Sequence, residues 1–313
     1  MALEIILNFG LLIASIAALV LIADKLINHS IKLAKIVGVS GTVIGLTLLA
    51  YGTSLPELAV STIASFQSHS ELSVSNIIGS NIYNIAITMG VVALFLPFAW
   101  KENLRREGLF MVASTLVLIA LAFIGGISSM VGIIMVLILA LHTYYVIKIE
   151  KRSSCEKVKK GKGSAKKEFL WCCLFLAGVL VAGNFTVHYA IQSAKLVGVS
   201  EWLIGSTIVA AGTSMPETVV SVIAARKKQM GMSLGNIIGS NYFNVFWILG
   251  ISAALKPFSF SIQAVWADLV FLSLITALFF MALLKKSISR YEGFAYIGIY
   301  VLFVFYLLKI LAF

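Results

Sequence analysis

The chain has 313 residues, of which 60% are hydrophobic and only 12% are charged, and its mean hydropathy is +1.02. A soluble domain of this size could not keep that much apolar surface away from water, so the composition predicts a polytopic membrane protein. The formal net charge of +11 comes mostly from short basic runs between apolar segments, where such residues set membrane topology, which argues against a nucleic-acid partner.

Ten apolar stretches are long enough to cross a bilayer at about 20 residues per helix, which predicts an all-α fold without a soluble domain. The expected helix cores are 5–27, 41–66, 72–98, 107–124, 127–147, 168–190, 202–225, 232–255, 262–284 and 291–312. The longest polar segment predicts a basic linker, 148–167, between a first unit, 1–147, and a second unit, 168–313.

The two units are copies of one another at an offset of 160 residues. Lys35–Val60 matches Lys195–Val220 at 15 of 26 positions without a gap, and Ser73–Asn84 matches Ser233–Asn244 at 8 of 12. Five helices per unit is an odd number, so the second copy must enter the membrane in the opposite orientation. We therefore expect two inverted five-helix repeats, as in secondary transporters, with a site at the midplane between them.

The distribution of Lys and Arg predicts the orientation in the cell membrane. If the N-terminus is outside, 21 of the 24 basic residues fall at inner helix ends and loops, and only Lys195, Lys256 and Lys309 fall outside. By the positive-inside rule, both termini are expected outside and the loop 148–168 in the cytoplasm. There its basic residues would contact anionic lipid headgroups of the bilayer.

The strongest chemical signal is a hexapeptide that occurs in both units, as Gly52-Thr53-Ser54-Leu55-Pro56-Glu57 and as Gly212-Thr213-Ser214-Met215-Pro216-Glu217. Proline inside a helix removes a backbone donor, which predicts that helices 2 and 7 are broken at these points. Free backbone and a carboxylate are tolerated at membrane depth only where they line a cavity. We therefore predict that Glu57 and Glu217 are cation ligands. The alternative is a structural carboxylate that is capped by a helix terminus or paired with a basic residue, but no Lys or Arg lies in the predicted cores of helices 2, 3, 7 or 8.

Further oxygen ligands are expected on the broken turns and on the helices that follow them. Asn76–Asn84 and Asn236–Asn244 repeat the pattern Asn-Ile-Ile-Gly-Ser-Asn-x-x-Asn, in which the Ser and the last Asn share one helix face. The other asparagines of this pattern, Asn76, Asn81, Asn236 and Asn241, are expected in helix–helix contacts. The remaining expected ligands are the side chains of Thr53, Ser54, Thr213, Ser214, Ser80, Ser240, Asn84 and Asn244 and the backbone carbonyls of Ala50 and Ala210.

This ligand set contains oxygen only, with no His or Cys, which argues against zinc and copper. Flexible oxygen ligands suit Ca²⁺, which takes six to eight of them, better than Mg²⁺, and Na⁺ accepts the same atoms. Ca²⁺ and Na⁺ are expected as transported ions, without a resident cofactor and with no protein partner implied.

The doubled Gly-Thr-Ser-x-Pro-Glu, each copy followed by Gly-Ser-Asn-x-x-Asn, resembles the two signature repeats of the sodium/calcium exchangers, over the whole chain and without a regulatory domain. The resemblance implies central Ca²⁺ coordination by Glu57 and Glu217, flanking Na⁺ sites, and a first and a sixth helix that slide past the rest. Some relatives carry Asp at the position of Asn244, so this site has two formal negative charges rather than three. The link 148–168 is too short for the calcium-sensing domains of animal exchangers.

Three other functions are alternatives to Na⁺/Ca²⁺ exchange. A proton-coupled antiporter for Ca²⁺ or another divalent cation would share the fold, but such relatives typically have Gly-Asn-x-x-Glu in place of the hexapeptide. A channel is less consistent with inverted repeats. An intramembrane enzyme would need paired Asp residues, a Ser–His pair or His-Glu-x-x-His, and the sequence has none of these at membrane depth.

Overall fold

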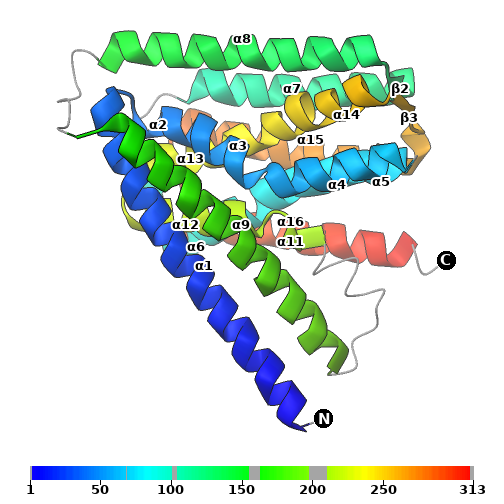
Figure 1. Cartoon of the computed structure of the whole chain (residues 1–313). Coiled ribbons are helices and arrows are strands. Elements are labelled where there is room, and N and C mark those ends of the chain that lie inside the picture. The colour runs from blue at the N-terminus through cyan, green and yellow to red at the C-terminus, as the bar shows by residue number, and fades with distance from the viewer. Residues whose placement is uncertain (1, 68, 101–103, 155–162, 197–209, 311–313) are drawn as a thin grey trace.

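The computed structural model describes residues 2–67, 69–100, 104–154, 163–196 and 210–310 (Figure 1). The elements of the first half are α1 (Ala2–Val37), α2 (Gly41–Ile44), the π-helix η1 (Gly45–Leu49), α3 (Ala50–Thr53), α4 (Leu55–Phe66), α5 (Ser70–Tyr83), the π-helix η2 (Asn84–Met89), α6 (Gly90–Phe95), β1 (Phe98–Ala99), α7 (Arg105–Ile124), β2 (Gly126–Ile127) and α8 (Ser129–Ser154). Those of the second half are α9 (Ala165–Leu196), α11 (Ala210–Gly212), α12 (Met215–Arg226), α13 (Met230–Phe243), the π-helix η4 (Asn244–Leu249), α14 (Gly250–Leu255), β3 (Phe258–Ser259), α15 (Ile262–Lys285), β4 (Ser287–Ile288) and α16 (Arg290–Ile310).

The described residues contain seven helices that are long and apolar enough to cross a membrane, or eight if one bent pair is counted as a single span. The prediction of a helical, polytopic membrane protein is confirmed at this level. The expected seventh span, 202–225, begins outside the described residues, and the expected tenth corresponds to α16, next to the undescribed end. The count of ten therefore stays a prediction. Both ends of the expected linker 148–167 belong to helices, because α8 runs to Ser154 and α9 begins at Ala165.

Both copies of the hexapeptide leave the helical conformation at their serine. The stretch Gly41–Thr53 and helix α4 meet at 45°, and Ser54 between them has φ −84° and ψ 10°. In the second copy Ser214 has φ −91° and ψ 6° between α11 and α12. Each proline then lies in the first turn of the following helix, where its missing N–H costs no hydrogen bond.

In the described part of the chain, three π-helices interrupt the helices around these breaks, and the sequence did not predict them. Two of them begin at equivalent positions of the repeat, η2 at Asn84 and η4 at Asn244. The third, η1, lies directly before α3. Such π-helical turns are rare and are frequently found at functional sites.

Two long helices lie obliquely across the rest of the molecule. In Figure 1, α1 (blue) and α9 (green) run side by side, and they pack along each other. His29 of α1 contacts Glu168 of α9, with 2.6 Å between Nδ1 and Oε2. α9 also passes the broken turns, because an added Cβ at Gly52 would lie 2.0 Å from Leu176 and one at Gly212 would lie 2.7 Å from Val187. The pair therefore covers the segment in which the helices are broken.

Short antiparallel strand pairs join the two halves, which the all-α prediction did not include. β1 pairs with β4, and β2 pairs with β3, so each half contributes one strand to each pair. Pro97 and Pro257, equivalent in the repeat, directly precede β1 and β3. Proline cannot continue the preceding helix, and the extended residues after it are free to form a backbone ladder.

Candidate cation site

Glu57 and Glu217 are fully buried and are linked crosswise between the two halves. Their exposed fractions are 0% and 1%. The hydroxyl of Ser54 donates to Oε1 of Glu217 at 3.0 Å, and the hydroxyl of Ser214 donates to Oε1 of Glu57 at 2.8 Å. Each carboxylate lies in the first turn of its helix, α4 or α12, where the helix dipole favours negative charge. The two halves thus meet at a reciprocal pair of hydrogen bonds.

A set of buried oxygens around these carboxylates has no hydrogen-bond partner among the described residues. Burying a polar oxygen without a partner costs about 1–3 kcal/mol, so such a set needs an explanation in the native molecule. These atoms are Oε2 of Glu57, Oε2 of Glu217, Oγ of Ser80, Oγ of Ser240, Oγ1 of Thr213, Oδ1 of Asn84 and Oδ1 of Asn244. They belong to residues that the sequence predicts as ligands, although Oγ of Ser233 and Oδ1 of Asn236, which were not expected as ligands, also lack a partner among the described residues.

The threonines are placed unequally. Thr53 Oγ1 donates to the carbonyl of Leu49 at 3.0 Å, a bond to the preceding turn that leaves its lone pairs available. Thr213 Oγ1 makes no hydrogen bond to a described residue.

Of the two carbonyls expected as ligands, the structure shows a hydrogen bond to that of Ala50. The carbonyl of Ala50 accepts a long hydrogen bond, 3.3 Å, from the backbone N–H of Ser54, and it keeps a second lone pair. Ala210 is the first described residue of its segment, at the start of α11. The roles of Ala50 and Ala210 therefore stay predictions.

Two asparagines expected in helix–helix contacts are confirmed there. Asn76 Nδ2 donates to Ser61 Oγ at 2.9 Å, between α5 and α4. Asn236 Nδ2 donates to Ser221 Oγ, also at 2.9 Å, between α13 and α12. Ser61 and Ser221 are equivalent at the 160-residue offset, and that recurrence is the signal by which the sequence could have identified them.

A hydroxyl cluster beside Glu217 has no counterpart beside Glu57. Thr88 Oγ1 and Thr218 Oγ1 lie 2.6 Å apart, and the buried Tyr83 precedes Thr88 in the chain at the end of α5. The equivalent positions in the other half are the apolar residues Phe243, Ile248 and Leu58. Because these residues do not recur in the repeat, no pattern in the sequence identified them. The site is therefore more polar on the Glu217 side.

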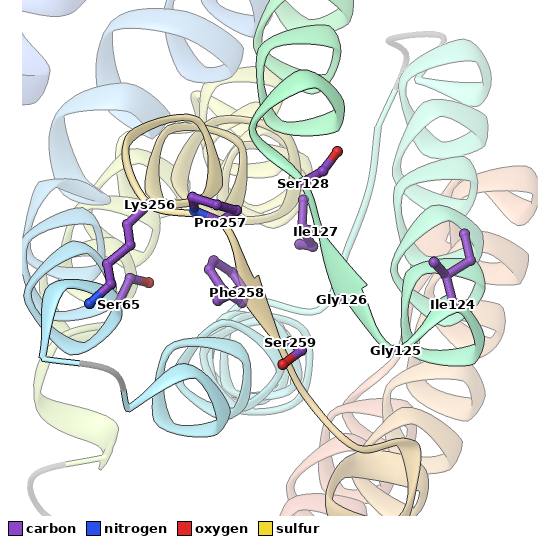
Figure 2. A pocket seen from close by; sticks show the side chains of 10 residues that line it. All are labelled: Ser65, Ile124, Gly125, Gly126, Ile127, Ser128, Lys256, Pro257, Phe258 and Ser259. Atoms are coloured by element: carbon purple, nitrogen blue, oxygen red, sulfur yellow. The ribbon is translucent and has the colours of Figure 1, made fainter.

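A pocket of about 580 Å³ lies elsewhere, at the end of the molecule where β2 and β3 pair (Figure 2). Its lining includes Ser65, Ser128 and Lys256 but neither glutamate. Lys256 Nζ donates to the carbonyl of Phe66 at the end of α4, at 2.8 Å. A lysine at this position stabilises the helix C-terminus, which is a structural role. We therefore place the candidate site at the glutamates and not in this pocket.

Comparison with known proteins agrees with this geometry. The family model described as sodium/calcium exchanger protein matches residues 7–148 and 167–309. The sodium/calcium exchanger MaX1 of Methanosarcina acetivorans is 31% identical, with 95% of this chain and 97% of that protein covered. The inner membrane protein YrbG of Escherichia coli is 30% identical, with 89% of each chain covered.

A solved structure of the sodium-calcium exchanger NCX_Mj, soaked with zero Na⁺ and Ca²⁺, superimposes with a TM-score of 0.83. It is 28% identical in sequence, and the match covers 97% of this chain and 99% of that one. The family match covers most of the chain in both halves, and the relatives match over nearly their full length. The chain is a membrane-embedded cation antiporter of the prokaryotic type and belongs to the sodium/calcium exchanger family.

Proposed function

We propose that the protein exchanges Na⁺ for Ca²⁺ across the cell membrane at a midplane site centred on Glu57 and Glu217. The observation that carries the proposal is the crosswise pairing of these carboxylates with Ser214 and Ser54, in which each carboxylate keeps one buried oxygen that has no partner among the described residues. Two buried carboxylates repel each other and lose hydration, and a bound cation compensates for both costs.

The ligand chemistry supports Ca²⁺ and Na⁺ as the cargo. Carboxylate, hydroxyl and amide oxygens are hard ligands, and their number suits the six to eight contacts of Ca²⁺. Among the described residues no three His, Cys, Asp or Glu side chains cluster together, so neutral oxygens must supply most of the ligands. The names of MaX1 and NCX_Mj identify those proteins as sodium/calcium exchangers, and we propose the same ions here.

We propose alternating access within two inverted five-helix repeats as the transport mechanism, with α1 and α9 as the moving pair. One ion pair links α1 to the second half, since Lys227 Nζ, just after α12, lies 2.7 Å from Asp24 Oδ1 on α1. A surface ion pair contributes at most about 1 kcal/mol. Sliding of the pair could therefore break this link at little cost. Both termini are proposed outside, with the loop 148–168 in the cytoplasm.

The second candidate is exchange of Ca²⁺ for protons on the same fold. Buried carboxylates can carry protons as well as cations, so Glu57 and Glu217 are compatible with it. The hydroxyls of Ser54 and Ser214 favour sodium, since they add neutral oxygens to the carboxylates.

The test is Ca²⁺ uptake into proteoliposomes that contain the purified protein. An outward Na⁺ gradient and an outward H⁺ gradient are imposed in parallel at matched external Ca²⁺. Uptake driven by the Na⁺ gradient alone is expected. Uptake driven only by the H⁺ gradient would replace the proposal with the second candidate.

A further inference from the structure

A chain of three buried amides connects the two halves beside the site. Asn244 Nδ2 donates to Asn81 Oδ1 at 2.9 Å, and Asn81 Nδ2 donates to the backbone carbonyl of Asn241 at 3.1 Å. The exposed fractions are 0% for Asn244 and 1% for Asn81 and Asn241. The bonds run from η4 to α5 and from α5 to α13, so Asn81 holds residues of the opposite half.

The direction of every bond in this chain is fixed by its last member. A backbone carbonyl can only accept, so the amide nitrogen of Asn81 must face Asn241. The side-chain oxygen of Asn81 then faces Asn244 and can only accept, so Asn244 must donate from its side-chain nitrogen. The oxygen of Asn244 is consequently turned away from Asn81, and it is buried without a partner among the described residues.

The other half of the repeat lacks this arrangement. Asn241, the equivalent of Asn81, turns its nitrogen to the carbonyl of Ile237 in its own helix, at 2.8 Å. Asn84, the equivalent of Asn244, has no hydrogen-bond partner at either amide atom within the described structure. Only one of the two candidate asparagine ligands is therefore held in a fixed orientation.

We infer that Asn81 is a positioning residue that makes Asn244 present its carbonyl oxygen, and not its N–H, to the transported cation. This inference rests on the proposed function. η4, which begins with Asn244, packs against α4, which carries Glu57, and Ser240 one turn earlier has a free hydroxyl oxygen among the described contacts. An amide has one acceptor end and one donor end, and a cation is attracted by the first and repelled by the second. Asn81 selects the attractive end.

The first test compares Asn81→Leu with Asn241→Leu, a matched control of equal burial in the same motif. Loss of the Asn81 oxygen frees the Asn244 amide to turn. KM for Ca²⁺ in Na⁺-driven uptake should therefore rise about tenfold, which corresponds to the loss of one buried hydrogen bond of about 1.4 kcal/mol. The maximum rate should stay within about twofold. The control should change KM by less than about threefold. Equal effects of both substitutions would overturn the inference.

The second test separates orientation from a merely structural role. In Asn244→Asp both side-chain oxygens can face a cation, so there is no amide to orient. Asn81→Leu should then raise KM about tenfold in the parent but less than about threefold in the Asn244→Asp background. The same fold-change in both backgrounds would mean that Asn81 only packs the two halves together, and the inference would fail.

Folding of the variants is checked by gel filtration and thermal melting in detergent. If the leucine variant is not recovered, Asn81→Ala, which adds no bulk, replaces it.

A structure of the parent protein with bound Ca²⁺ gives an independent result. Oδ1 of Asn244 facing the cation supports the inference, and Nδ2 facing it overturns it. If the parent shows no Na⁺-driven uptake at all, the proposed function fails, which is a different result from unchanged KM values in an active protein.

Discussion

At the scale of single residues, the site depends on a balance of charge. Glu57 and Glu217 are its only two formal charges among the residues assigned to it, and both are fully buried. Every other assigned ligand is neutral. A divalent cation would therefore meet a net charge of equal magnitude and opposite sign, and the attraction between them offsets part of the cost of removing both from water.

The first prediction follows from this balance. Glu57→Gln and Glu217→Gln should each lower Na⁺-driven Ca²⁺ uptake in proteoliposomes by more than about 100-fold, because loss of one member of a buried ionic set costs about 3–5 kcal/mol. Glu71→Gln is the control, since Glu71 is an exposed acid in the first turn of α5. Near-normal uptake by either glutamine variant would remove that residue from the site.

The sequence identified most of these residues but not how they face one another. The repeat shows that Ser54 is equivalent to Ser214, and it predicts a serine near each glutamate. It does not predict that each serine bonds to the glutamate of the opposite half, because equivalence in sequence carries no information on contact between copies. The cluster of Thr88 and Thr218 was not predicted because neither threonine has a hydroxyl residue at the equivalent position of the other half.

At the scale of helices, close approach of two backbones holds the site in place. An added Cβ at Gly45 in η1 would lie 2.3 Å from the carbonyl oxygen of Met232 in α13. An added Cβ at Gly235 in α13 would lie 2.7 Å from the carbonyl oxygen of Thr42 in α2. Backbone atoms cannot give way as a flexible side chain can, so both positions require glycine.

The second prediction is that Gly45→Ala and Gly235→Ala each destabilise the protein by about 1–3 kcal/mol, because overpacking forces the two helices apart. Thermal melting of the detergent-solubilised protein measures the loss. Gly298→Ala is the matched control, since Gly298 is exposed on α16 and an added Cβ meets no described atom within 4 Å. A melting temperature equal to that of the parent for both glycine variants would contradict the packing argument.

The helical course of the chain was largely predictable, whereas its local irregularities were not. Long apolar stretches and the two prolines predicted where helices run and where the hexapeptides interrupt them. The π-helices at Asn84 and Asn244 depend on backbone hydrogen-bond geometry, which has no sequence periodicity of its own. The strand pairs are two residues long, too short to produce the alternation by which a strand is recognised.

At the scale of the whole molecule, the distribution of basic residues predicts the orientation in the membrane. Single cysteines placed in 155–165 should react with an impermeant maleimide only from the cytoplasmic side, and those placed in 67–70 only from outside. The native cysteines are first replaced, because Cys173 is exposed. The reverse labelling pattern would overturn the predicted topology.

The crosswise bonds between serines and glutamates have a consequence for how the protein can be assembled. Neither half holds a complete site, since Glu57 takes its serine from the second half and Glu217 takes its serine from the first. The site is therefore formed between the two halves, as a site at a subunit interface is formed between two chains.

Two separate fragments, residues 1–154 and 163–313, should therefore copurify when they are expressed together and recover Na⁺-driven Ca²⁺ uptake. Either fragment alone should be inactive. Ser54→Ala in the first fragment should remove the hydrogen bond to Glu217 in the second fragment and leave the bond from Ser214 to Glu57 in place. Uptake by a single fragment would contradict this expectation, because it would show that two copies of one half can form a working site together.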